Sequence, residues 1–237
     1  MDEATYGRGQ VEWALWRSFT IRSFAARKKV PKIFRTRIKR LLEIDRGLDL
    51  SGAEVPPEAS YTFAPPPSDQ SGDTAYRSVD AFCIAVALDL LDAGFKQTEV
   101  VFLMRYLRPD LEIRFACLLE PPSLINRQRT RAKNFPDLPA YEENGQLYAD
   151  KRLFVVLQKV EMTEIISAIE KPRYRFPVIL EPIFCEGMEA LTEALHDLMP
   201  NRRRAVTVLE LAASAQAVAV FLKEAPAIQR GRPQKTA

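Results

Sequence analysis

Apolar residues recur at steps of three and four in two stretches near the beginning of the chain, which is the spacing of one helix face. The first stretch, GQVEWALWRSF at 9–19, places on one side Val11, Ala14, Leu15 and Phe19. The second, PKIFRTRIKRLLEIDRGL at 31–48, repeats the stripe with Phe34, Ile38, Leu41, Leu42, Asp45 and Leu48. Pro31 suits the first turn of this helix and Gly47 a left-handed stop. Two helices with a connector, the second one basic, are typical of a helix-turn-helix.

A second pair of helices is predicted at 79–92 and 97–106, with Ser78 as the cap of the first and Gly94 as its left-handed end. Between the two pairs, residues 50–73 hold five prolines and few aliphatic residues, so we expect a surface loop or linker there. After the second pair, Pro109 is expected to interrupt the helix.

The second half of the chain has a different pattern. Residues 121–145 form a proline-punctuated connector. Branched and aromatic residues then predict strands in RLFVVLQKVEM and RFPVILEPIFC, followed by an amphipathic helix in EGMEALTEALHDLM with Met188, Leu191, Leu195 and Leu198 in register. The last ordered stretch, AVTVLELAASAQAVAVFLKEA, begins like a strand and continues as a helix.

The pattern therefore predicts a mainly α fold with a small α+β C-terminal unit and a helix-turn-helix in the N-terminal domain, and the family resemblance described below implies that this domain is a winged helix-turn-helix. We expect the DNA-binding domain at 1–120, a linker at 121–145 and a dimerisation or sensor unit at 146–226. A tail that we expect to be disordered follows at 227–237.

Composition narrows the class of protein. With 47% hydrophobic and 27% charged residues among 237, the chain is expected to be soluble and globular, and its apolar runs are too short to cross a bilayer. We expect no secretory signal, because MDEATYGRGQ has acidic residues where such a signal has a basic end and an apolar run. We expect no membrane association, and a cytoplasmic, nucleoid-associated location. Cys83, Cys117 and Cys185 each lie among apolar residues, which predicts buried, reduced thiols.

Positive charge is concentrated near the N-terminus. Residues 17–46 carry eleven Lys and Arg against two carboxylates, Glu43 and Asp45, while the remainder of the chain is net acidic. Such a field suits a polyanion. A solvated basic face on an ordinary core helix is the alternative.

The segment from Tyr76 to Leu107, with the spacing YR-S-x-D-AF followed by L-DLLDAGFKQTEVVFLM, resembles the winged-helix domain of the mercury-resistance-regulator (MerR) type. The resemblance implies that Tyr76 and Arg77 are wing residues near phosphate and that the helix at 32–46 enters the major groove. The chain departs from the family in its longer linker at 50–73 and in the absence of the long dimerisation helix expected after the second pair.

The tail contains Arg230-Gly231-Arg232-Pro233, which is similar to the AT-hook motif. We expect it to be an auxiliary minor-groove contact, and a solubilising tail is the alternative. The full set of candidate DNA contacts is Arg27, Lys28, Lys29, Lys32, Arg35, Arg37, Lys39, Arg40, Tyr76, Arg77, Arg230 and Arg232.

The expected function is a sequence-specific regulator that binds double-stranded DNA, as a homodimer, with an unknown effector. The alternative is a basic interaction protein or RNA-binding protein, and a nucleic-acid-processing enzyme comes after it. Catalysis is not expected, because there is a single histidine, His196, and no phosphate loop, nucleophile elbow or metal-ligand spacing, so no cofactor or metal is expected either.

Overall fold

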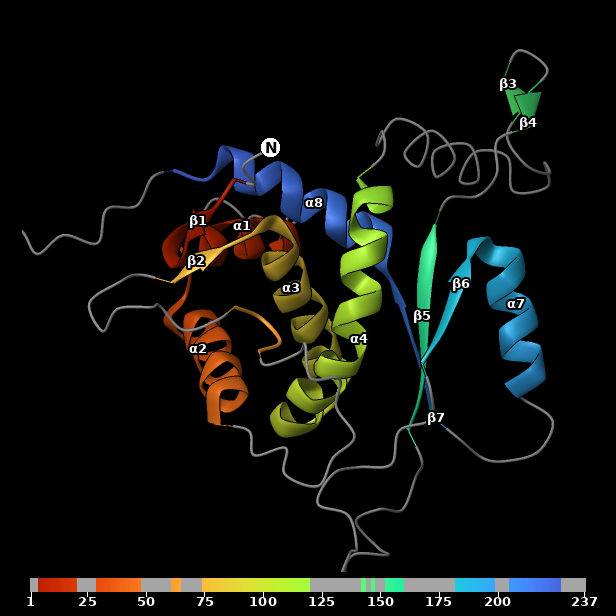
Figure 1. Cartoon of the computed structure of the whole chain (residues 1–237), viewed down its shortest axis with the longest axis horizontal. Helices are drawn as coiled ribbons and strands as arrows, with labels where there is room; N and C mark the ends of the chain where they lie inside the picture. Colours follow the sequence, from red (N-terminus) through yellow and green to blue (C-terminus); the bar gives the residue numbers. More distant parts are fainter. Residues whose placement is uncertain are drawn as a thin grey trace, which may run out of the picture.

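The computed structural model of the chain is mostly helical, with a small antiparallel sheet at one side (Figure 1). The residues that it describes are 4–20, 29–47, 61–64, 74–119, 142–143, 146–147, 152–159, 182–198 and 205–226.

Four helices form the first part of the fold, and all four were predicted. They are α1 (Arg8–Thr20), α2 (Lys32–Gly47), α3 (Ser78–Asp92) and α4 (Gln97–Leu118). The apolar stripes of α1 and α2 face the core, where Val11, Leu15, Ile38 and Leu41 are almost completely buried. A short strand pair, β1 (Tyr6–Gly7) with β2 (Ala75–Tyr76), joins the start of α1 to the start of α3.

The helix α4 continues through Pro109, so the expected interruption is wrong. Pro109 is on the solvent side of the helix, while Leu107 and Leu111 on the opposite side are buried in the core. Packing along that side holds the turn helical, although proline removes one of its hydrogen bonds.

Two of the three predicted helix ends differ in detail. Gly94 has the expected left-handed conformation, with φ of 91°, but Gly47 is the last helical residue and is not left-handed. Ser78 is not the cap of α3: the cap is Arg77, whose backbone N–H donates to the Asp80 carboxylate at 2.7 Å.

The sheet has the order β6-β5-β7, and all its strands are antiparallel: β5 (Leu153–Lys159), β6 (Ile183–Glu186) and β7 (Ala205–Glu210). Helix α7 (Gly187–Leu198) packs on one face, against Phe154, Val156 and Cys185. Met188 of α7 is exposed rather than in register with Leu191. A separate two-stranded pair joins β3 (Glu142–Glu143) and β4 (Gln146–Leu147), within and just after the expected connector.

The C-terminal helix α8 (Leu211–Glu224) belongs to the core of the N-terminal helices. It packs against α1 and α3, and the same core includes the side chains of β5 that face away from α7 (Figure 1). Gln216 donates to the carbonyl of Leu118 at 3.1 Å, and the Arg17 guanidinium lies over the rings of both Trp13 and Phe221. Helix α8 thus shares the larger core with the N-terminal helices, while Phe154, Val156, Cys185 and Leu191 form a separate, smaller core under α7.

Two further expectations about burial need correction. Cys83 and Cys185 are buried as expected, but Cys117 is exposed on the outer side of α4. Within the expected surface linker at 50–73, the structure describes residues 61–64, and of these Thr62, Phe63 and Ala64 are buried. Polar contacts described below explain why this part of a proline-rich segment lies inside.

Candidate nucleic-acid interface

The outer face of α2 carries a concentration of exposed basic side chains. Ile38, Leu41, Leu42 and Asp45 point into the core, so the residues between them point to solvent. The exposed basic side chains on α2 are Lys32, Arg37, Lys39, Arg40 and Arg46, with Lys29 exposed just before the helix. Ile33, in the first turn, is 74% exposed among them.

The candidate contacts on α2 differ in their partners. Arg37 pairs with Asp92 of α3 at 2.8 Å, and Lys39 pairs with Glu43 at 3.3 Å, but all four side chains are exposed. Exposed pairs of this kind contribute little and exchange readily for other anions. For the side chains of Lys29, Lys32 and Arg40, no ion pair or hydrogen bond is found within the described ranges. These three are the cations with the fewest competing partners.

Arg35 has a structural role between the first two helices. Its Nε lies 3.5 Å from Oε2 of Glu12, a carboxylate of α1 that is almost completely buried, and Arg8 binds Oε1 of the same group at 2.9 Å. A buried carboxylate requires such compensation. A contact between Arg35 and DNA, as expected from the sequence, would therefore compete with its ion pair to Glu12.

Of the two residues expected to form a wing, Tyr76 is buried and Arg77 is partly exposed but paired with two carboxylates. Tyr76 is 1% exposed, and burial raises the pKa of its hydroxyl. Arg77 pairs with Asp80 at 3.4 Å and with Glu112 of α4 at 2.7 Å. The Tyr76 side chain is therefore a core residue, and we no longer include it among the candidate DNA contacts.

Four of the candidates, Arg27, Lys28, Arg230 and Arg232, lie outside the described residues. The expected tail at 227–237 lies outside them too.

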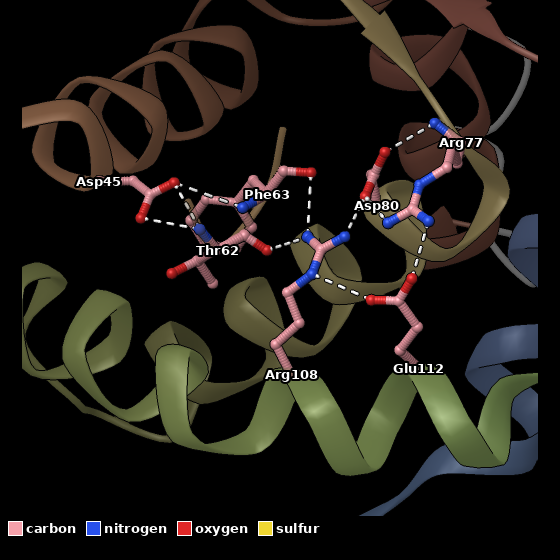
Figure 2. Close-up of polar contacts among 7 residues, drawn as sticks. All are labelled: Asp45, Thr62, Phe63, Arg77, Asp80, Arg108 and Glu112. Atoms are coloured by element: carbon pink, nitrogen blue, oxygen red, sulfur yellow. Dashed lines mark hydrogen bonds and ion pairs between the residues drawn. The ribbon is translucent and has the colours of Figure 1, made fainter. Parts of the chain in front are cut away.

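A buried set of polar contacts holds α2 from behind. Asp45, in the last turn of α2, accepts hydrogen bonds from the backbone N–H groups of Thr62, at 2.9 Å, and Phe63, at 3.3 Å (Figure 2). Arg105 of α4 donates to the Asp45 carboxylate at 3.2 Å and to the Asp45 backbone carbonyl at 2.6 Å. The end of α2 is thus fixed to α4 and to residues 61–64 at once.

Arg108, one turn further along α4, completes this set. Its guanidinium donates to the carbonyls of Thr62 and Phe63 and to the Asp80 carboxylate, the last at 2.5 Å (Figure 2). Glu112 lies 3.4 Å from its Nε. Burial opposes the charge of Arg108, but the hydrogen bond and charge of Asp80, with Glu112, outweigh it and raise the pKa of Arg108. The buried segment at 61–64 therefore has its backbone groups satisfied by charged side chains.

Sequence reasoning missed most of this set. In the sequence, Asp45 stands out only as a carboxylate on the apolar stripe of the helix. A carboxylate on a buried face requires a compensating partner, and this is the single sequence feature that points to the set of contacts. Arg105 and Arg108 lie in FLMRYLRPDL, where they look like ordinary exposed helix residues. These two arginines are buried because residues 61–64 pack into the core beside them. The hydrophobic pattern of the helix itself does not predict this long-range contact.

The described residues contain no group of three or more metal-ligating side chains. In the same part of the chain, no helix combines the length and apolarity required to span a bilayer. Comparison of the chain with protein-family models, with curated proteins and with solved structures found no significant match.

Proposed function

We propose that the chain is a sequence-specific regulator of transcription that binds double-stranded DNA with α2 in the major groove. The observation that carries the proposal is the division of α2 into two faces. One face is fixed through Asp45 and Arg35, and the other presents Lys32, Arg37, Lys39 and Arg40 to solvent. A rigid helix with a cationic outer face suits groove binding, because phosphate contacts supply affinity and a fixed helix supplies register.

The proposal includes the winged-helix arrangement. The strand pair β1–β2 lies beside α1 and precedes α3, which is where the MerR resemblance would place a wing. In this arrangement the wing strand β2 is two uncharged residues long, and Arg77 directly after it is paired with Asp80 and Glu112, so α2 would provide most of the DNA contacts.

Binding of single-stranded RNA is the second candidate, and the aromatic residues near the basic segment weigh against it. Stacking with unpaired bases requires exposed rings. Trp16 and Phe34 pack edge to face with their ring centroids 5.3 Å apart. Phe19 also packs edge to face against Phe34, and Trp13 does so against Phe221. Trp13, Trp16, Phe19 and Phe34 are all partly buried by these contacts, so duplex DNA is the favoured ligand.

The test is a fluorescence-polarisation titration of the full chain against random duplex DNA, matched RNA and matched single-stranded DNA at two salt concentrations. We expect tight, salt-dependent binding with a preference for duplex DNA. Equal binding to all three, or no binding, would refute the proposal and leave the basic face to a protein partner.

Variants assign the contacts. Lys32→Ala and Arg40→Ala remove cations that have no ion-pair partner in the described part of the chain, so each should weaken binding and reduce the salt slope by about one unit. On a site selected from a sequence pool, loss of a base-reading arginine should cost about 1–3 kcal/mol on that site only. Lys223→Ala, which removes an exposed charge at the end of α8, is the matched control and should change neither.

A further inference from the structure

The cations of α2 differ in how firmly the protein itself holds them, and Arg37 lies between the two extremes. Arg35 is paired with Glu12, a carboxylate of α1 that is almost completely buried. For Lys32 and Arg40, no ion pair or hydrogen bond is found within the described ranges. Arg37 is paired, but both members of its pair are exposed to solvent. How readily Arg37 binds a ligand therefore depends on how strongly its partner competes.

The partner of Arg37 is Asp92, the last residue of α3. Nη1 of Arg37 lies 2.8 Å from Oδ1 of Asp92, and the two side chains are 50% and 59% exposed. Helix α3 ends directly after Asp92, where the Ala93 N–H donates to the carbonyl of Asp89 and Gly94 turns the chain. The C-terminal end of a helix carries partial negative charge, which favours a nearby cation. The carboxylate and the helix end therefore both attract the Arg37 guanidinium.

Asp92 is held in place by the core and not by α2. Helix α3 is buried along most of its length, and Phe82 and Leu88 on it are almost completely inaccessible to solvent. By contrast, Glu43, which pairs with Lys39, lies on α2 itself. Asp92 thus presents its carboxylate to the basic face of α2 from a separate, firmly packed helix.

We propose that Asp92 takes the place of a DNA phosphate at Arg37 and thereby lowers the affinity of α2 for DNA. A carboxylate and a phosphate both offer oxygen acceptors to a guanidinium, so they compete for the same donor atoms. When α2 enters a groove, Arg37 exchanges Asp92 for a phosphate oxygen, and the charge of Asp92 is left beside the DNA. Loss of the ion pair and repulsion between Asp92 and phosphate both oppose binding.

This internal competitor limits binding to DNA of unrelated sequence. Nonspecific binding is almost entirely electrostatic, so a carboxylate that withholds one arginine weakens it on every sequence alike. The role of Asp92 rests on the proposed function, because it regulates the same face of α2.

Fluorescence polarisation with random duplex DNA tests this role in variants of the full chain. Asp92→Asn keeps the shape of the side chain and removes its charge, so we expect roughly two- to fivefold tighter binding, within the range of exposed ion pairs. The salt slope should also steepen by up to about one unit, because Arg37 no longer brings its own counter-charge. Asp197→Asn removes the same charge from an exposed position of α7 and is the matched control, which should bind like the wild type.

An Arg37→Ala background separates competition from simple repulsion. With no guanidinium to withhold, Asp92→Asn should then tighten binding clearly less than it does in the wild type. Equal gains in the two backgrounds, or no gain in the wild type, would overturn the role of Asp92 and leave DNA binding by α2 intact. If neither the wild type nor any variant bound duplex DNA, the proposed function would fail, and this role with it.

Discussion

At the residue scale, Asp45 connects the basic helix to the rest of the protein. Its carboxylate is buried and compensated by Arg105 and by two backbone N–H groups. Loss of one member of a buried pair leaves the other charge without compensation, which is costlier than loss of the pair.

Asp45→Ala or Arg105→Ala should therefore lower the free energy of unfolding by about 3–5 kcal/mol. The double variant Asp45→Leu, Arg105→Met should recover much of that loss, because neither charge remains. Urea denaturation followed by circular dichroism measures both. If the single variants lost less than the double variant, the pair would not be the buried, mutually dependent contact that its geometry indicates.

Asp89 gives the protein a pH-dependent stability. Burial, with the charge of Asp92 added, raises the pKa of Asp89 to about 6, whereas the unfolded chain titrates near 3.9. Between these values the folded state binds more protons than the unfolded state. Stability from this group is thus complete below about pH 4 and is lost as pH rises through about 6.

Asp89→Asn keeps the shape of the side chain and removes its charge. It should raise the free energy of unfolding at pH 7 by roughly 1–3 kcal/mol and flatten the profile between about pH 4 and 6. Denaturation at a series of pH values measures this effect. Asp92→Asn, which removes an exposed charge, is the control and should change stability by less than about 1 kcal/mol. A profile for Asp89→Asn parallel to that of the wild type would contradict the assignment.

At the element scale, the sequence predicted the helices well because their signals are local. The apolar stripes of α1, α2 and α3 follow the helical period, and Gly94 marks a left-handed turn that other residues adopt at a cost. The prediction was wrong at Pro109, because the buried packing of Leu107 and Leu111 keeps the helix continuous past the proline. The buried segment at 61–64 was missed for the same reason, since Arg105 and Arg108 act on it from over forty positions away.

For the candidate site, the sequence identified the basic face of α2 but not which of its cations serve the fold. On a helical wheel, neither Arg35 nor Arg40 belongs to the apolar stripe, so the sequence predicts solvent exposure for both side chains. Only the three-dimensional position of Glu12, on the preceding helix, distinguishes Arg35 from Arg40. Tyr76 is a similar case. The family resemblance predicts its position in the wing motif, but it does not predict that the ring is buried.

Pro109→Ala tests how α4 tolerates its proline. Proline in a helix interior costs about 3 kcal/mol relative to alanine, and Pro109 is exposed, so the exchange loses no packing. We expect an increase in the free energy of unfolding of roughly 1–3 kcal/mol. Asp110→Ala, at the neighbouring exposed position, controls for helix propensity alone and should give a smaller change. A loss of stability in Pro109→Ala would mean that the bend imposed by proline is needed for the contacts of Arg105 and Arg108.

At the scale of the whole molecule, helices from both ends of the chain share the larger of two hydrophobic cores. Ala215, Val218 and Leu222 of α8 are buried against the helices of the first half, and Gln10 at the start of α1 donates to the carbonyl of Ala225 at 3.4 Å. Of the described residues after 145, α8 and the inner side of β5 belong to this larger core, and the cluster under α7 lies apart from it.

A fragment of residues 1–120 should accordingly fail to fold as a unit. It would contain α1 to α4 but expose the apolar surface that α8 covers. We expect reduced helicity and no cooperative thermal transition, where the full chain shows both, measured by circular dichroism. A fragment that melted cooperatively with the helix content of α1–α4 would contradict the shared core.

The packing of α1 on α8 also fixes the order in which the chain can mature during translation. Nearly two hundred residues separate these helices, so the ribosome completes most of the protein before the first helix meets its packing partner. Until then, the apolar side of α1 remains uncovered in the nascent chain, where chaperones bind such surfaces. Premature termination anywhere before residue 211 therefore leaves a product that cannot close its core.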